Sequence, residues 1–152
     1  MSEHAKSKVS TRFLKLLIFL MFATFAMTTD SVGTIIPEVI REYRLGMTAA
    51  GSFHYASMSG IGIAAILLGF LADRIGRKST ILLGLGLFCA TSALFAVGNS
   101  FGMFVALLFV SGLGIGIFKS GALALIGDVS SSTRDHASNM NLVEGFFGVG
   151  AI

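Results

Sequence analysis

Residues 69–78 read Gly-Phe-Leu-Ala-Asp-Arg-Ile-Gly-Arg-Lys and form a compact, highly charged segment between two long apolar runs. Residues 45–72 and residues 79–118 contain no Asp, Glu, Lys or Arg. Each run is longer than the roughly 20 residues that a helix needs to cross a bilayer. A charged turn between two such runs indicates that the chain crosses a membrane, turns, and crosses it again.

The composition supports a membrane protein independently of this turn. Hydrophobic residues make up 54% of the chain and charged residues 12%, against about 25% charged residues in soluble domains. The formal charge is +3, but the basic residues stand at the ends of apolar runs and form no stripe, which argues against nucleic-acid binding. The single cysteine, Cys89, leaves no disulfide framework or cysteine-based metal site. We expect no cofactor, no metal and no enzymatic activity.

The apolar pattern divides the chain into four complete spans and the start of a fifth. The predicted spans cover about residues 13–37, 47–72, 79–97, 101–126 and 136–152. The run 79–118 must fold back, because a single helix of that length would be about 60 Å long, twice the bilayer core. Residues 98–100 (Gly-Asn-Ser) are the turn signal within it. Ser132 and Asp135 can form a capping box for the fifth helix, which is cut off at Ile152, so we expect a truncated chain.

Small residues repeat at every fourth position along two of these spans. The repeats are Ser52, Ala56, Gly60 and Ala64 on the second span and Gly112, Gly116 and Ser120 on the fourth. Such ridges allow helix backbones to approach closely in lipid. They predict either close structural packing or helices that slide against each other during a conformational cycle.

The basic residues also predict the orientation of the chain. The N-terminal tail (residues 1–12) and the turn at residues 69–78 are the strongly basic ends, whereas the turn at residues 98–100 has no charge. Because cytoplasmic loops carry an excess of Lys and Arg, we expect a cytoplasmic N-terminus. The predicted location is a plasma membrane or a bacterial inner membrane.

The turn at residues 69–78 resembles the signature G-x-L-A-D-R-x-G-R-(K/R), which lies between the second and third helices of major facilitator superfamily transporters. The resemblance implies an all-α transmembrane fold of twelve helices in two six-helix halves, with the substrate site between the halves. This chain would be the N-terminal portion of that fold. The missing C-terminal half of the same chain is then an expected partner.

Asp30 and His54 are the predicted proton-coupling residues. Asp30 lies about 21 Å along the first span from Leu16, in its outer half, and His54 lies at a similar depth near the outer end of the second span. A charge at the bilayer centre costs at least about 2.5 to 3.5 kcal/mol, whereas a carboxylate and an imidazole at matching depth can share a proton. The alternative is that Asp30 only bonds to neighbouring hydroxyl groups and that His54 lies at the interface.

Lys119 and Glu144 are predicted to form a buried charge pair, because they lie at similar depths on consecutive helices. Asn141 is a further cavity candidate. The surrounding residues 114–119 and 139–146 are similar to the fucose permease branch of the superfamily, in which a glutamate usually occupies the position of Lys119 and a glutamine that of Glu144. The alternative is a snorkelling lysine and an unrelated glutamate.

The charged turn is predicted to act as a cytoplasmic gate. Its proposed members are Gly69, Asp73, Arg74, Gly76, Arg77 and Lys78, together with Asp128. The resemblance implies that Asp73 docks against the N-terminus of a helix in the missing half, where the helix dipole favours an anion. Arg77 and Lys78 are expected to pair with Asp128. The alternative is a basic anchor that only fixes the topology.

These observations together predict a secondary active transporter that moves a small polar organic solute, with a sugar as the favoured candidate, by proton-coupled alternating access. Efflux of amphipathic compounds is an alternative that the 14 phenylalanines favour. Many drug exporters of the superfamily have an arginine where this chain has Leu108, so coupling through that arginine is ruled out. A non-transporting membrane sensor with the same fold is the other alternative. The expected partners are the lipid bilayer, the solute, protons and the missing half, without nucleic acid.

Overall fold

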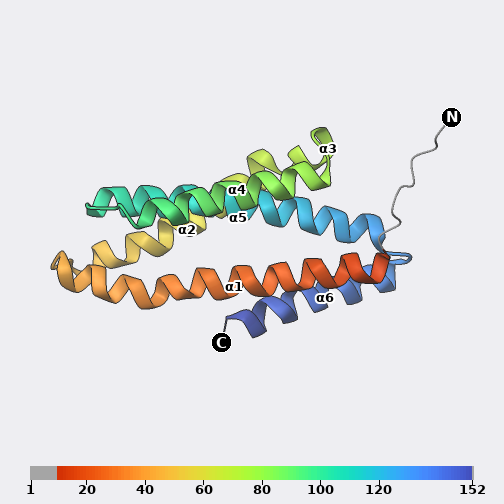
Figure 1. Cartoon of the computed structure of the whole chain (residues 1–152), viewed down its shortest axis with the longest axis horizontal. Helices are drawn as coiled ribbons and strands as arrows, with labels where there is room; N and C mark the ends of the chain where they lie inside the picture. The colour runs from red at the N-terminus through yellow and green to blue at the C-terminus, as the bar shows by residue number, and fades with distance from the viewer. Residues whose placement is uncertain (1–9, 152) are drawn as a thin grey trace. The chain divides into compact units, whose positions relative to one another are not determined.

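The computed structural model describes residues 10–151, leaving aside the side chains of residues 28–32, 34–35 and 47. Within this part of the chain every regular element is a helix, as predicted (Figure 1). The helices are α1 (Thr11–Glu42), α2 (Met47–Leu68), α3 (Leu71–Arg74), α4 (Arg77–Phe95), α5 (Phe101–Val129) and α6 (Thr133–Gly150).

The helices belong to two compact units. The first unit combines the described residues up to Thr28 with those from Ile126 onward, and the second contains Thr29–Leu125. Helices α1 and α5 therefore each contribute one part to each unit.

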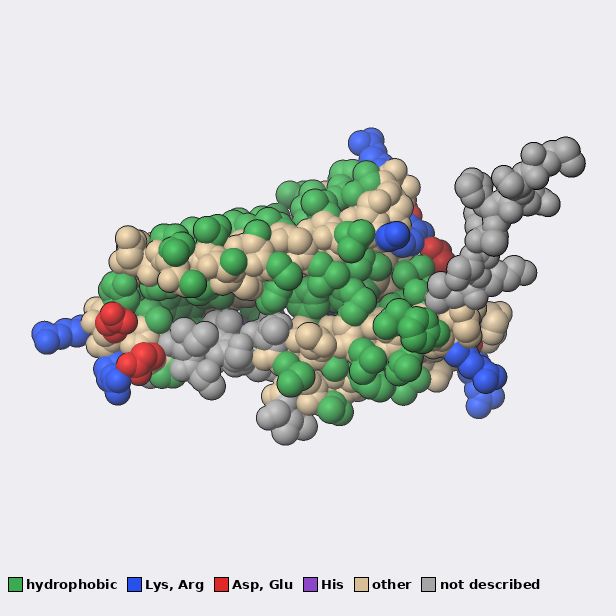
Figure 2. Space-filling view, viewed as in Figure 1, with side chains coloured by type: hydrophobic (Ala, Val, Ile, Leu, Met, Phe, Trp, Pro, Cys, Tyr) green, Lys and Arg blue, Asp and Glu red, His purple; other side chains and the backbone are tan. Residues whose placement is uncertain are grey.

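Three helices of the described part are long and apolar enough to cross a membrane, namely Thr48–Leu68, Arg77–Phe95 and Phe101–Val129. They correspond to the predicted second, third and fourth spans. The predicted first span falls on α1, part of whose side chains lie outside the described residues. Helix α6, on which the predicted fifth span falls, carries Arg134, Asp135 and Glu144 and is not among the three. In the face shown in Figure 2, hydrophobic side chains cover the lengths of the helices and most charged side chains lie near the helix ends.

Two helix ends differ from the predicted span limits by four residues or more. Helix α1 continues past Pro37 to Glu42, because proline removes only one backbone N–H and spanning helices tolerate that loss. Helix α2 ends at Leu68, and the chain forms a turn at Gly69 and Phe70 before the short α3 begins. Glycine is a weak helix former, so the apolar run extends beyond the helix that it builds.

Backbone contacts hold the second unit together. A Cβ atom added at Gly60 of α2 would lie 2.2 Å from the carbonyl oxygen of Phe109 on α5, and one added at Gly112 of α5 would lie 2.3 Å from that of Ser57. On another side of α5, a Cβ atom at Gly84 of α4 would lie 2.4 Å from the backbone nitrogen of Phe118. Helix α5 thus packs directly against both α2 and α4. The contacts confirm close packing of the predicted small-residue ridges.

The first unit packs the N-terminal part of α1 against α6, which lie side by side (Figure 1). The rings of Phe19 and Phe146 stack with their centroids 5.4 Å apart. Further along the two helices, a Cβ atom added at Gly150 would lie 2.2 Å from the carbonyl oxygen of Ala23. Phe22 and Val143 are fully buried in this unit. The apolar contacts continue up to the polar ends of the two helices, where Lys15 and Asp135 lie.

Candidate functional site

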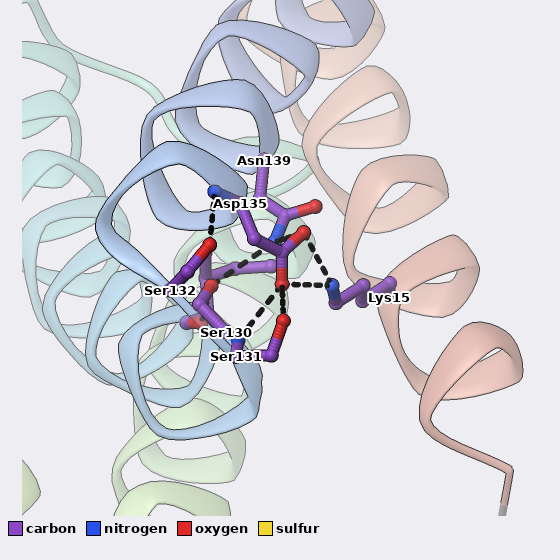
Figure 3. A network of polar contacts seen from close by, with 7 residues as sticks. Lys15, Ser130, Ser131, Ser132, Asp135 and Asn139 are labelled. Atoms are coloured by element: carbon purple, nitrogen blue, oxygen red, sulfur yellow. Dashed lines mark hydrogen bonds and ion pairs between the residues drawn. The ribbon is translucent and has the colours of Figure 1, made fainter.

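An ion pair joins the N-terminal ends of α1 and α6 in the first unit. Lys15 Nζ donates to both carboxylate oxygens of Asp135, at 3.1 Å to Oδ1 and 3.0 Å to Oδ2 (Figure 3). The two side chains are only 18% and 30% exposed. We call Lys15, Asp135 and the four residues that surround Asp135 (Ser130, Ser131, Ser132 and Asn139) the polar cluster.

The start of α6 fixes the position of Asp135. Ser132 is the N-cap residue, and its hydroxyl oxygen accepts a hydrogen bond of 3.1 Å from the backbone N–H of Asp135. This bond confirms one arm of the predicted capping box. The carboxylate does not return to Ser132 but accepts from the backbone N–H of Ser131 at 2.9 Å and from the Ser131 hydroxyl at 3.2 Å. In a capping box the carboxylate would accept from the backbone N–H of the N-cap residue Ser132. Here it accepts instead from Ser131, one residue earlier in the loop that precedes α6.

Asn139 connects the carboxylate to the end of α5. Asn139 is 4% exposed, and its Nδ2 donates to Asp135 Oδ1 at 3.2 Å and to Ser130 Oγ at 3.0 Å. The Ser130 hydroxyl donates in turn to the carbonyl oxygen of Ile126 at 2.7 Å. Asp135 therefore receives donors from α1, from the loop and from α6 itself (Figure 3).

These donors stabilise the ionised carboxylate. The backbone N–H of Ser131, followed by the Lys15 ammonium, lowers the pKa of Asp135 from 3.8 to about 2. Asp135 therefore remains a carboxylate throughout the physiological pH range. The capping pattern pointed to Asp135 in the sequence, but nothing in it pointed to Lys15 or Asn139 as its partners, since Lys15 is 120 residues away.

The charged turn is organised around an internal ion pair of the second unit. Arg77 Nη1 donates to Asp73 Oδ1 four residues earlier, and the guanidinium of Arg74 lies 5.2 Å from the centre of the Phe70 ring. Gly76 connects α3 to α4 with a φ of 86°, a conformation that suits glycine because it has no Cβ atom. Asp73 is 75% exposed, so its carboxylate remains accessible to a further partner.

The other predicted gate residues lie near this turn or at the end of α5. A Cβ atom added at Gly69 would lie 2.7 Å from the carbonyl oxygen of Ala65. Lys78 and Asp128 are both exposed. The structure pairs Arg77 with Asp73, and the expected pairing of Arg77 and Lys78 with Asp128 stays a prediction.

The predicted residues inside the spans are spread over both units. His54 is exposed on α2, with its ring edge-to-face against that of Tyr55. The backbone of Asp30 belongs to α1, but its side chain lies outside the described residues, so the coupling role of Asp30 and His54 stays a prediction. Lys119 is half-buried on α5 in the second unit.

Asn141 and Glu144 are exposed on α6 in the first unit. Because Lys119 and Glu144 belong to different units, their pairing also stays a prediction. Neither residue takes part in the polar cluster, which is built from other residues at the start of α6.

Comparisons with known proteins extend over almost the whole chain. Residues 17–152 match the family model of the Major Facilitator Superfamily. The quinolone resistance protein NorA of Staphylococcus aureus is 27% identical over 139 residues, which are 89% of this chain and 35% of NorA. The 4-hydroxybenzoate transporter PcaK of Pseudomonas aeruginosa is 29% identical over 113 residues, which are 74% of this chain and 25% of PcaK. This chain therefore spans about a third of the length of NorA and a quarter of that of PcaK. No solved structure matches it.

Proposed function

Because the chain belongs to the major facilitator superfamily, we propose that it forms part of a membrane carrier that moves a small organic solute by alternating access. The family match over residues 17–152 is the observation that supports this proposal most directly. The three apolar helices, packed backbone to backbone, are consistent with it. In such a carrier the solute binds between two halves of the protein, and the site opens to one side of the membrane at a time.

The solute that we propose is a small amphipathic aromatic compound. Two similar proteins support this class, since one is named for quinolone resistance and the other for 4-hydroxybenzoate transport. The 14 phenylalanines offer apolar rings to such a solute. A sugar is the second candidate, favoured by the resemblance of residues 114–119 and 139–146 to the fucose permease branch. In that branch a glutamate usually occupies the position of Lys119 and a glutamine that of Glu144. This chain therefore differs from the branch in charge at both positions, which weakens the sugar as a candidate.

Proton coupling is part of the proposal. Asp30 and His54 are the proposed coupling pair, and protonation of Asp30 would change the relative stability of the outward-open and inward-open states. The buried Leu108 occupies the position at which many drug exporters have an arginine. Coupling therefore has to use other residues, which makes the carboxylate of Asp30 the first candidate.

The charged turn is the proposed gate on the cytoplasmic side. We place the N-terminus in the cytoplasm, because the basic tail and the basic turn both favour that side. The ion pair between Asp73 and Arg77 stabilises the conformation of the turn. The exposed part of the Asp73 carboxylate is available to the N-terminus of another helix, where a partial positive charge stabilises an anion. Breaking that contact would accompany opening toward the cytoplasm.

Transport in proteoliposomes tests the proposed function. The full-length protein is reconstituted with an imposed pH gradient, and the uptake of radiolabelled 4-hydroxybenzoate and of radiolabelled L-fucose is measured against protein-free liposomes. Gradient-driven movement of 4-hydroxybenzoate is the expected result. Movement of L-fucose alone would favour the second candidate. Saturable binding without movement of either compound would contradict the carrier and favour the sensor.

A further inference from the structure

Large apolar side chains form an exposed stripe along α2 that ends at the charged turn. Its members, spaced as one face of a helix, are Ile63, Ile66, Leu67 and Phe70, and each is at least 40% exposed. Helix α2 itself ends at Leu68, but Gly69 and Phe70 keep right-handed helical backbone angles. The ring of Phe70 therefore continues this α2 stripe to its end at the turn.

The kind of side chain in the α2 stripe indicates that lipid covers it. Where α2 packs against α5, the contact is made by small residues, since a Cβ atom added at Gly116 would lie 2.6 Å from Ala64 Cβ. Close helix contacts in a bilayer use small residues, because acyl chains are as apolar as leucine and large aliphatic side chains gain little by leaving them. The exposed isoleucine and leucine side chains of α2 are therefore suited to acyl chains.

Helix α4 repeats this arrangement on the other side of the turn. Lys78 stands one helical turn before Leu82 and three turns before Cys89, on the same face of α4. All three residues are exposed. We call Leu82 and Cys89 the α4 stripe. A lysine at the end of such a stripe lays its hydrocarbon stem along apolar surface and places its ammonium at the level of the lipid headgroups.

Arg74 is the cation at the end of the α2 stripe. Its guanidinium lies 5.2 Å from the centre of the Phe70 ring, and stacking on a ring leaves the N–H groups at the guanidinium edge available to a phosphate. Asp73 pairs with Arg77. Among the described residues, no ion pair or hydrogen bond engages the charged group of Arg74 or of Lys78. Because these two residues are four positions apart, their Cα atoms are separated by at most about 14 Å.

We propose that Arg74 and Lys78 bind the phosphate groups of anionic phospholipids, whose acyl chains lie along the α2 and α4 stripes. Phosphate oxygens accept strong charge-assisted hydrogen bonds from both kinds of cation. The cytoplasmic leaflet, on whose side the proposed orientation places this turn, is the anionic one. The inference goes beyond the proposed function, because it needs neither a particular solute nor a working gate. Lipid bound at these two residues would hold the turn that carries Asp73 at the membrane surface.

Lipid binding to the full-length protein in detergent tests the inference. Native mass spectrometry measures the apparent Kd of dioleoylphosphatidylglycerol, which is anionic, and of dioleoylphosphatidylcholine, which has the same acyl chains and no net charge. The wild type is expected to prefer the anionic lipid by at least about tenfold, and Arg74→Gln/Lys78→Gln is expected to lose this preference. Arg41→Gln/Arg44→Gln is the matched control, because it removes the same charge from two exposed residues at the end of α1.

Four outcomes would overturn the inference. A wild type that binds both lipids equally would refute it, and this comparison does not depend on how any variant folds. A preference that survives in Arg74→Gln/Lys78→Gln would place the lipid elsewhere, and equal losses in both double variants would show that only the net charge attracts it. Competition by glycerol 3-phosphate as strong as that by phosphatidylglycerol would identify a site for a free phosphate compound. Because no transport is measured, failure of this inference and failure of the proposed function are separate results.

Discussion

Lys15 Nζ lies 3.0 Å from Asp135 Oδ2, so the first turns of α1 and α6 are joined by an ion pair whose members are 120 residues apart in the chain. Both side chains are mostly buried, and Asp135 also accepts from Ser131 and Asn139. A partly buried pair with such additional hydrogen bonds is less screened than an exposed one. The pair therefore contributes to holding the two helix ends together.

Replacement of Lys15 by methionine is expected to lower the thermal stability of the full-length protein, because Asp135 keeps its charge but loses its cationic partner. Arg12→Met is the matched control, since Arg12 is an exposed basic residue at the same end of α1. Thermal unfolding in detergent, followed by size-exclusion fluorescence, measures both variants. Equal melting temperatures in the two variants would contradict a stabilising role for the pair.

The stability of the first unit should also respond to acid. The pKa of Asp135 is about 2 in the folded chain and about 3.9 in an unfolded one, so folding favours the ionised form. This contribution is fully present above about pH 4 and is lost as the pH falls toward about 2. Between pH 5 and pH 8 it is constant. Acid unfolding of the wild type should therefore be steeper in the range from about pH 4 to about pH 2 than that of Asp135→Asn, and parallel curves would contradict the assignment.

The substitution Gly112→Ala should disrupt the packing of α2 against α5. The new methyl group would lie 2.3 Å from the carbonyl oxygen of Ser57, and backbone cannot move aside as a flexible side chain can. Overpacking of this kind typically costs about 1 to 3 kcal/mol. Gly102→Ala on the same helix is the control, because nothing lies within 4 Å of its added Cβ atom. The yield of folded protein and its melting temperature should fall only for Gly112→Ala.

Asp30→Asn tests the proposed proton coupling. The amide cannot cycle between charged and neutral forms, so accumulation of solute against a gradient should be abolished while exchange of solute down its gradient is partly retained. Both activities are measured in proteoliposomes with and without an imposed pH gradient. Normal pH-dependent accumulation by the variant would remove Asp30 from the mechanism.

Asp73→Asn tests the proposed gate. The change removes the ion pair with Arg77 and the negative charge offered to another helix, so transport should slow and the inward-open population should increase. Labelling of introduced cysteines from the cytoplasmic side reports that population. Glu38→Gln is the control, because it breaks another exposed helical pair, with Arg41, outside the gate. Unchanged labelling together with full transport in Asp73→Asn would show that Asp73 is not part of a gate.

Periodic and compositional features made most of the helices predictable. The charged turn and the Gly-Asn-Ser segment at residues 98–100 divide the apolar runs where α4 begins and where α5 is separated from it. The end of α2 was harder to predict from the sequence, because residues 69–72 are apolar whether or not they are part of the helix. The continuation of α1 past Pro37 was missed because a single proline does not decide whether a spanning helix ends.

The polar cluster shows why the site was harder to predict than the helices. A capping box is a local pattern, so Ser132 and Asp135 could be found from their spacing. The choice of Lys15 as partner depends on the packing of α1 against α6, which no local pattern encodes. The same limit applied to Asn139, whose burial depends on helices that approach from elsewhere in the chain.

The contacts of Gly60 and Gly112 have a mechanical consequence. Where side chains separate two helices, a shift of one can be absorbed by a change of rotamer, but main-chain atoms have no such freedom. Between Ser57 and Gly112 and between Gly60 and Phe109 no compressible layer separates α2 from α5. The two helices therefore move together as one rigid body. A displacement imposed at the charged turn, beyond the end of α2, also shifts the segment of α5 that contains Lys119.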